Sequence, residues 1–257
     1  APTDVTAMAA MTIITGGNVG IGTAVPQYKL HTAMQSSAEA EAAISTFRNA
    51  TGGGNLYLQH SRHNTDNSHT ILADDDVTGI IAFHGSDGAA WRPTATISSF
   101  VDGTPGSSDM PGRLVFATTA DGAATSTDRM TILENGNVGI GDSEPASMLE
   151  IEAVDGTAKV SVFRQDADIN DTELLGRFDF QGSDLGVAAT RKVGAFISAV
   201  AQGDWTATGD WVQPTKLKFY TQDGNSGANG LDSPNMVIDK DGNVGIGTDS
   251  PGAKLEI

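Results

Sequence analysis

The six-residue sequence GNVGIG occurs three times in this chain, and a proline and a short apolar stretch follow each copy. The copies are GGNVGIGTAVPQYKLHT at residues 16–32, NGNVGIGDSEPASMLEI at 135–151 and DGNVGIGTDSPGAKLEI at 241–257. A repeat of this kind constrains the fold more than any single motif, because each repeat is one structural unit. We therefore expect tandem units.

The sequence between the copies repeats as well. GIIAFHGSDG from Gly79 matches GRFDFQGSDLG from Gly176, and RLVFATTADG from Arg113 matches KLKFYTQDG from Lys216. Six blocks recur in the same order. They divide the chain into residues 1–32, the terminal hairpin of a preceding repeat, residues 33–151, a first full β-repeat unit, and residues 152–257, a second one.

The blocks have the pattern of β-strands. Phe178 and Phe180 alternate with polar residues, as do Leu217 and Phe219, and a period of two places alternate residues on one face of a half-buried strand. Asn-Gly at 135–136 and Asp-Gly at 241–242 favour hairpin turns. We expect an all-β fold. The Ala- and Glu-rich segment 33–43 fits a short helix and an acidic loop equally well.

The glycines of GNVGIG do not form a phosphate loop. A dinucleotide site needs G-x-G-x-x-G at the start of a helix, whereas these copies have G-x-x-G-x-G followed by a proline. Glycine within a strand allows another backbone to approach closely. We expect sister chains to bury the glycines, valines and isoleucines of these hairpins around a shared axis.

Composition excludes several functions. The net charge of -17 opposes binding to nucleic acid, and the chain has no cysteine for a disulfide or a thiolate metal site. No apolar run reaches the ~20 residues that span a bilayer, so we expect no membrane insertion. The chain begins at Ala1, and we expect it to come from a longer protein.

The stretch DGTPGSSDMPGRLVFATTADGAATSTDRMTILENGNVGIG, residues 102–141, resembles the repeated shaft segment of bacteriophage tail fibres and related virion appendages. In that family the segment often precedes a C-terminal intramolecular chaperone that cleaves itself off. The resemblance implies tandem small β-domains, joined by the glycine-rich GNVGIG hairpins, in an intertwined homotrimeric fibre whose chains run side by side in register. The chaperone would lie beyond Ile257.

Candidate chemistry is sparse. His60, His63 and His69 lie close together in sequence, and ADDDV at 73–77 carries three carboxylates, but a hydrated loop and a solvated charge run explain both better than a metal site does. The stretch DKDGNVGIGTDS, residues 239–250, does not fit a calcium-binding EF-hand loop. Such a loop needs glycine at position 6 and glutamate at position 12, whereas this stretch has glycine at position 4 and serine at position 12. No nucleophile or metalloprotease motif occurs. We assign no catalytic, cofactor-binding or metal-binding residue and expect no enzyme activity.

Trp205 and Trp211 stand in a loop that is longer than its counterpart in the first unit. Loops that vary between matched units are free to take on recognition, and exposed indole rings stack on sugars. A contact with a surface glycan is one interpretation of this pair. Packing against the small core or between chains is the favoured one, because aromatic residues are enriched at interfaces.

The sequence thus predicts a structural fibre protein of a phage virion, in the tail or another external appendage, that serves host attachment. Its expected partners are copies of itself, other virion proteins and a host surface receptor, a glycan among the candidates. The alternatives are a carbohydrate-binding or depolymerase segment of a tailspike and a bacterial extracellular adhesin.

Overall fold

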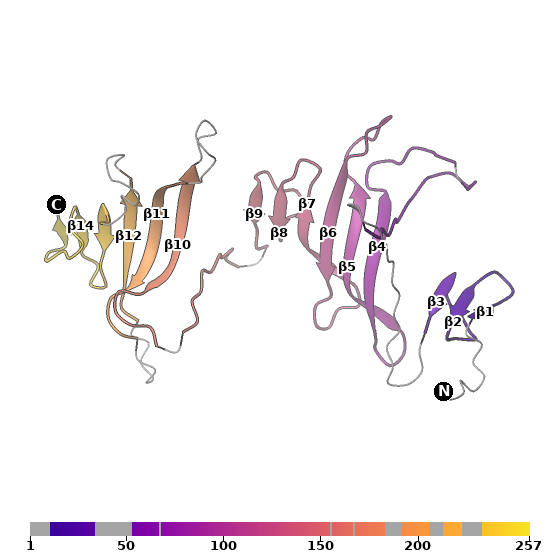
Figure 1. Ribbon diagram of the computed structural model, residues 1–257, viewed down its shortest axis with the longest axis horizontal. Helices are drawn as coiled ribbons and strands as arrows, with labels where there is room; N and C mark the ends of the chain where they lie inside the picture. Colours follow the sequence, from indigo (N-terminus) through magenta and orange to yellow (C-terminus); the bar gives the residue numbers. More distant parts are fainter. Residues whose placement is uncertain are drawn as a thin grey trace. The chain divides into compact units, whose positions relative to one another are not determined.

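A computed structural model describes most of the chain. It covers residues 11–33, 53–66, 68–154, 156–166, 168–182, 192–205, 213–222 and 233–257. Every regular element in these ranges is a β-strand, and the strands form three sheets (Figure 1). Contacts between residues group the chain into two compact units, 1–155 and 156–257. The segment 34–43, where helix and loop fitted equally well, lies outside the described residues.

The first sheet has three short strands, β1 (Met11–Ile13), β2 (Val19–Ile21) and β3 (Leu30–Thr32). β1 and β2 are antiparallel, and β3 runs parallel to β2. The first GNVGIG copy supplies β2, and the turn before it contains Gly16 and Gly17, both with positive φ.

The second sheet has six strands in sequence order. They are β4 (Val77–Ser86), β5 (Trp91–Val101), β6 (Gly112–Thr118), β7 (Thr127–Ile132), β8 (Val138–Ile140) and β9 (Leu149–Ile151). Strands β4 to β8 form an antiparallel meander, and β9 pairs in parallel with β8. At the Asn-Gly turn between β7 and β8, Gly136 has a φ of 86°.

The third sheet repeats this order. Its strands are β10 (Leu174–Gly182), β11 (Lys192–Ala201), β12 (Thr215–Thr221), β13 (Met236–Ile238), β14 (Val244–Ile246) and β15 (Leu255–Glu256). Register shifts fall at matching points, between Phe83 and His84 in β4 and between Phe180 and Gln181 in β10. The predicted strands and hairpins of the repeat are therefore confirmed.

The GNVGIG hairpins differ from the expected linkers between domains. In both larger sheets the hairpin strand pairs with the meander before it and with the parallel strand after it. The hairpins thus extend each sheet instead of connecting one domain to the next.

The buried side of these hairpins is closed by the chain itself. Residues 141–148 connect the parallel strands β8 and β9, a shorter connection than the dozen or so residues that usually join parallel neighbours. The connection passes over Gly139, which is buried, and a Cβ there would overlap the backbone oxygen of Asp142. A Cβ at Gly245 would lie 2.5 Å from the oxygen of Thr248. The prediction that sister chains bury these glycines was wrong, because the crossover occupies that space.

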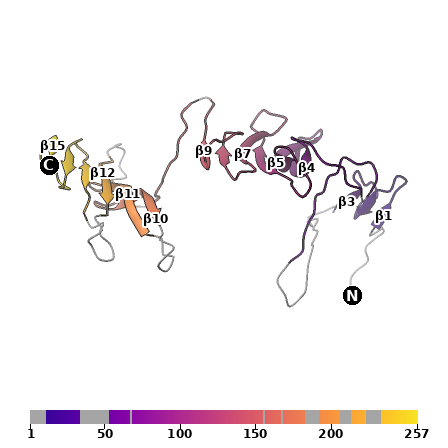
Figure 2. The same ribbon diagram turned by 90° about the horizontal axis from the view of Figure 1, so that it is seen from above.

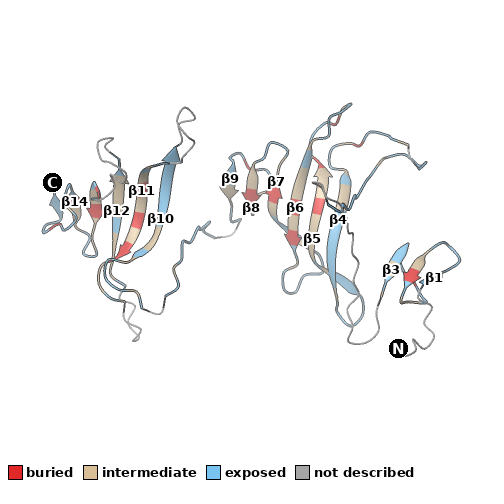
Figure 3. Cartoon of the chain, viewed as in Figure 1, coloured by how far each residue is buried: buried red, intermediate tan, exposed pale blue. Residues whose placement is uncertain are grey.

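Each of the two larger sheets is a single layer among the described residues (Figures 1 and 2). Buried residues gather on the central strands, while β4 and β10 are exposed along most of their length (Figure 3). The residues with the lowest exposure are small, and they include Val101, Ala117, Thr131, Ser198, Ala201 and Val237. The core within one chain is therefore thin.

Replacement of Gly139 by alanine should lower the free energy of unfolding by about 1–3 kcal/mol, the usual cost of overpacking. The new methyl group would collide with backbone that cannot swing away. Chemical denaturation of the purified chain measures the change. Gly85→Ala is the matched control in strand β4, since its Cβ would lie 3.5 Å from Thr94, an ordinary contact. Equal effects of the two substitutions would contradict the crossover explanation.

Candidate functional site

One face of the second sheet carries a continuous row of large apolar side chains. The register places one residue from each of the six strands side by side: Ile81, Ile97, Phe116, Met130, Ile140 and Ile151. Ile81 and Ile140 are 46% and 44% exposed, and the other four are half-buried. We call the side of the sheet with this row its open face.

The third sheet carries the same row. Its members, in strand order, are Phe178, Ile197, Phe219, Met236 and Ile246. Phe178 is 55% exposed, and Phe180, two residues further along the same strand, is 59% exposed. Contiguous apolar surface of this kind usually marks an interaction site.

On the opposite face of the second sheet, four neighbouring residues that the chain buries are small or polar. Ser98, Val115, Thr131 and Gly139 lie side by side on four strands of the second sheet, and all are buried. Along this row the usual arrangement of a sheet, with large apolar residues inside, is thus inverted.

Charged side chains close this opposite face. The Arg113 guanidinium stacks over the Phe100 ring at 4.8 Å, and that of Arg177 over Phe196 at 4.3 Å. Phe196 also stacks on Tyr220, with ring centroids 4.1 Å apart. Both sheets therefore shield this face with cation–π contacts from within the chain.

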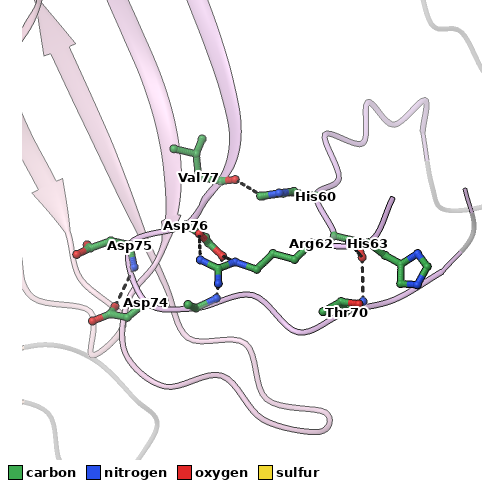
Figure 4. A network of polar contacts seen from close by, with 10 residues as sticks. His60, Arg62, His63, Thr70, Asp74, Asp75, Asp76 and Val77 are labelled. Atoms are coloured by element: carbon green, nitrogen blue, oxygen red, sulfur yellow. Dashed lines mark hydrogen bonds and ion pairs between the residues drawn. The ribbon is translucent and has the colours of Figure 1, made fainter. Parts of the chain in front are cut away.

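A polar network fixes the chain just before β4 (Figure 4). Arg62 donates from Nε and Nη2 to both carboxylate oxygens of Asp76, at 2.6 and 2.7 Å, and the backbone N–H of Ala73 donates to the same carboxylate. Hydrogen bonds from Arg62 and Ala73 lower the pKa of Asp76 to about 2. His60 Nδ1 lies 2.7 Å from the carbonyl oxygen of Val77, to which it can only donate.

The second unit has a counterpart of this network. Arg164 donates to the carbonyl oxygen of Leu174 at 3.1 Å and pairs with Glu173 at 3.2 Å. Leu174 begins β10 as Val77 begins β4. The network therefore anchors the segment ahead of each first strand, and its role is architectural.

The acidic run 73–77 is occupied by partners from the chain. Asp74 accepts from the backbone N–H of Gly103 at 2.7 Å, Asp75 pairs with Arg113, and Asp76 pairs with Arg62. Asp75 has a φ of 66°, and its counterpart Thr172 has 70°. The carboxylates thus hold a left-handed turn in place.

His60, His63 and His69 line a polar hollow of about 580 Å³, together with Thr78 and Met110. His63 Nδ1 accepts from the backbone N–H of Thr65 at 2.9 Å. Among the described residues no group of three or more histidine, aspartate, glutamate or cysteine side chains is arranged to hold a metal ion. In the same part of the chain, no helix has the length and hydropathy needed to cross a membrane.

Of the two candidate glycan-binding residues, the structure describes Trp205 and leaves Trp211 outside the described residues. The indole N–H of Trp205 donates to the carbonyl oxygen of Pro214 at 3.2 Å. The backbone N–H of Trp205 donates to the carbonyl oxygen of Ile169 at 2.8 Å. Trp205 is half-buried and ties these two segments together. A role in glycan contact stays a prediction for both residues.

The sequence shows one repeated polar position whose hydrogen-bonding role sequence reasoning missed. His31, Glu150 and Glu256 align in the three GNVGIG copies, and each accepts a backbone N–H from the crossover, donated by Gln27, Ala146 and Gly252 respectively. The position requires an acceptor, which the sequence signals by placing an imidazole or a carboxylate after each leucine.

Acid should loosen two turns, the one before β4 that Asp76 holds and the one between β4 and β5, where Asp87 accepts from the backbone N–H groups of Ala89 and Ala90. The pKa of each carboxyl is lowered from 3.8 to about 2, for Asp87 chiefly by its hydrogen bond from Arg92. Their stabilising contribution is therefore complete above about pH 4 and is lost as the pH falls through about 2. Thermal unfolding between pH 5 and 2 should show the midpoint falling mainly below pH 4. Asp76→Asn should reduce that fall, and an unchanged pH profile would show that the pair with Arg62 does not support the fold.

Comparison with known proteins gives a likeness of fold. No protein-family model and no curated protein sequence matches the chain. Among solved structures, the chain is structurally similar to the carboxy-terminal domain of the bacteriophage T5 L-shaped tail fibre, with a TM-score of 0.38, 12% identity, and coverage of 83% of this chain and 93% of that one. It is also similar to that domain solved with its intramolecular chaperone domain, with a TM-score of 0.37 and 13% identity. This second match covers 82% of this chain and 64% of the chain solved with the chaperone domain.

Proposed function

We propose that this protein is a structural fibre protein of a phage virion and serves host attachment as a homotrimeric rod. The observation that carries the proposal is the matched pair of open faces, one on each six-stranded sheet. Each carries a row of large apolar side chains that the single chain leaves exposed or half-buried. Other copies of the chain supply the missing cover.

Energetics support assembly. Full burial of one large apolar side chain contributes about 1.5–3 kcal/mol. Most row members are already half-buried, so each contributes part of this amount, and the two rows together are of the same order as the loss of freedom on association, about 4–15 kcal/mol. The resemblance of residues 102–141 to fibre shaft repeats supports three as the number of copies. Chains in register then bring like face to like face.

The proposal assigns the parts of the chain as follows. Residues 1–32 are the terminal hairpin of a preceding repeat, and 33–151 and 152–257 are two shaft units. The rod holds a receptor-binding part away from the particle and needs no catalytic residue, cofactor or metal. Its partners are its own copies, other virion proteins and a receptor on the host surface, and its location is the tail or another external appendage.

Assembly is tested by mass. Size-exclusion chromatography with light scattering should report about three times the chain mass of 26.5 kDa. Ile81→Asp combined with Phe178→Asp should shift this mass to that of one chain, because each substitution places a charge on an open face. Since both side chains are exposed in the single chain, its β-sheet circular dichroism should remain.

Met148→Asp is the matched control, since Met148 is 83% exposed but lies in the crossover between β8 and β9. It should leave the mass unchanged. A wild-type chain that stays monomeric at micromolar concentration would refute the proposal.

Receptor contact by Trp205 and Trp211 is a separate proposal. A glycan array with the wild-type chain should give a signal that falls at least about tenfold in Trp211→Ala. Trp205→Phe, which keeps an aromatic ring in a half-buried position, separates a loss of stacking from a loss of structure. If the array shows no binding, both tryptophans are left with a packing role only.

A further inference from the structure

Two extended segments ahead of the larger sheets have the sequences of strands. NLYLQH, Asn55–His60, precedes β4, and KVSVFR, Lys159–Arg164, precedes β10. Apolar residues alternate in both, at Leu56 and Leu58 and at Val160 and Val162, with the β-branched and aromatic residues that favour strands. Neither segment is a strand in the single chain, and Figure 1 draws both without arrows.

Among the described residues, the backbones of both segments have no backbone partner. Within the described part of the chain, none of the N–H or carbonyl groups of residues 55–60 and 159–164 forms a hydrogen bond to another backbone group. Their side chains are exposed as well, by 73% for Tyr57 and 82% for Phe163. A strand-like sequence that exposes both its backbone and its apolar side chains lacks a partner.

The two segments are held in equivalent positions. Leu58 lies against Gly79, where an ideal Cβ would be 2.7 Å from the Leu58 Cβ, and Val162 lies against Gly176, where it would be 2.5 Å from the Val162 Cγ1. Gly79 and Ile81 are alternate residues of β4, so this contact is on the open face. Side chains of both segments also hold the first carbonyl group of the strand, as described above for His60 and Arg164.

Each of the two larger sheets also ends in a long edge strand with one free side. β4 has 10 residues and β10 has 9, and each is hydrogen-bonded to one neighbour only among the described strands. Such edges attract strands from other chains. One copy of the chain therefore offers two unpaired segments and two free edges, in the same order along the sequence, so a second copy in register can match each segment with an edge.

We propose that Asn55–His60 and Lys159–Arg164 of one copy become strands on the β4 and β10 edges of a neighbouring copy. This inference rests on the proposed fibre assembly and extends it, because it adds backbone pairing to the contact between open faces. The partner is a second copy of this chain, since the seats of both segments are continuous with the open faces.

Amide exchange and crosslinking on the assembled full chain test the pairing. Amide hydrogens of residues 56–60 and 160–164 should exchange at least about 100-fold more slowly than in free peptides, as ladder-bonded amides do. A photo-crosslinking phenylalanine derivative in place of Tyr57, in an assembly of isotopically light and heavy copies, should join light chains to heavy ones within β4. The same derivative at Phe163 repeats the test on β10, and at Met148 it is the control that should give no such product.

The total mass of the same sample separates the two proposals. A trimer with fast exchange at these amides, or with crosslinks only inside one chain, overturns the strand exchange and leaves the fibre standing. A monomer overturns both.

Discussion

The close approach of backbone to Gly139 and its equivalents is the constraint on which the sheets depend. A connection as short as residues 141–148 can join two parallel neighbours only if it lies directly on the strand. Asn137 donates to the carbonyl oxygen of Pro145 at 2.9 Å, and Glu150 accepts from the backbone N–H of Ala146, so side chains from before and after the crossover hold its middle in place. The parallel strand that follows brings each large sheet to six strands.

The sequence predicted the strands and turns because those depend on local pattern. The alternation around Phe178 and the Asn-Gly pair at 135–136 determine strand and hairpin without knowledge of the rest. The same alternation could not show which face is covered, because that depends on what packs against it. The role of Gly139 was misjudged for a related reason: close approach was expected from another chain, and the crossover of the same chain provides it.

Side-chain partners lay further beyond the reach of the sequence. The run at 73–77 has the composition of a cation site, yet Arg62 and Arg113 stand 14 and 38 residues from their carboxylate partners and occupy them. Trp205 belongs to a loop of unmatched length, but its indole N–H is used within the chain. Long-range pairs of this kind leave no periodic trace, so only coordinates reveal them.

The near identity of the two apolar rows has a consequence for alignment. Ile197, Phe219, Met236 and Ile246 repeat the residue types of Ile97, Phe116, Met130 and Ile140. A neighbour displaced along the chain by one whole unit would therefore meet an almost equivalent surface, and these rows alone cannot distinguish correct from slipped alignment. Discrimination has to come from positions at which the units differ, such as Asp75 against Thr172 and Asp102 against Gln202. In the proposed fibre, divergence between the units at such positions would hold neighbouring copies in register.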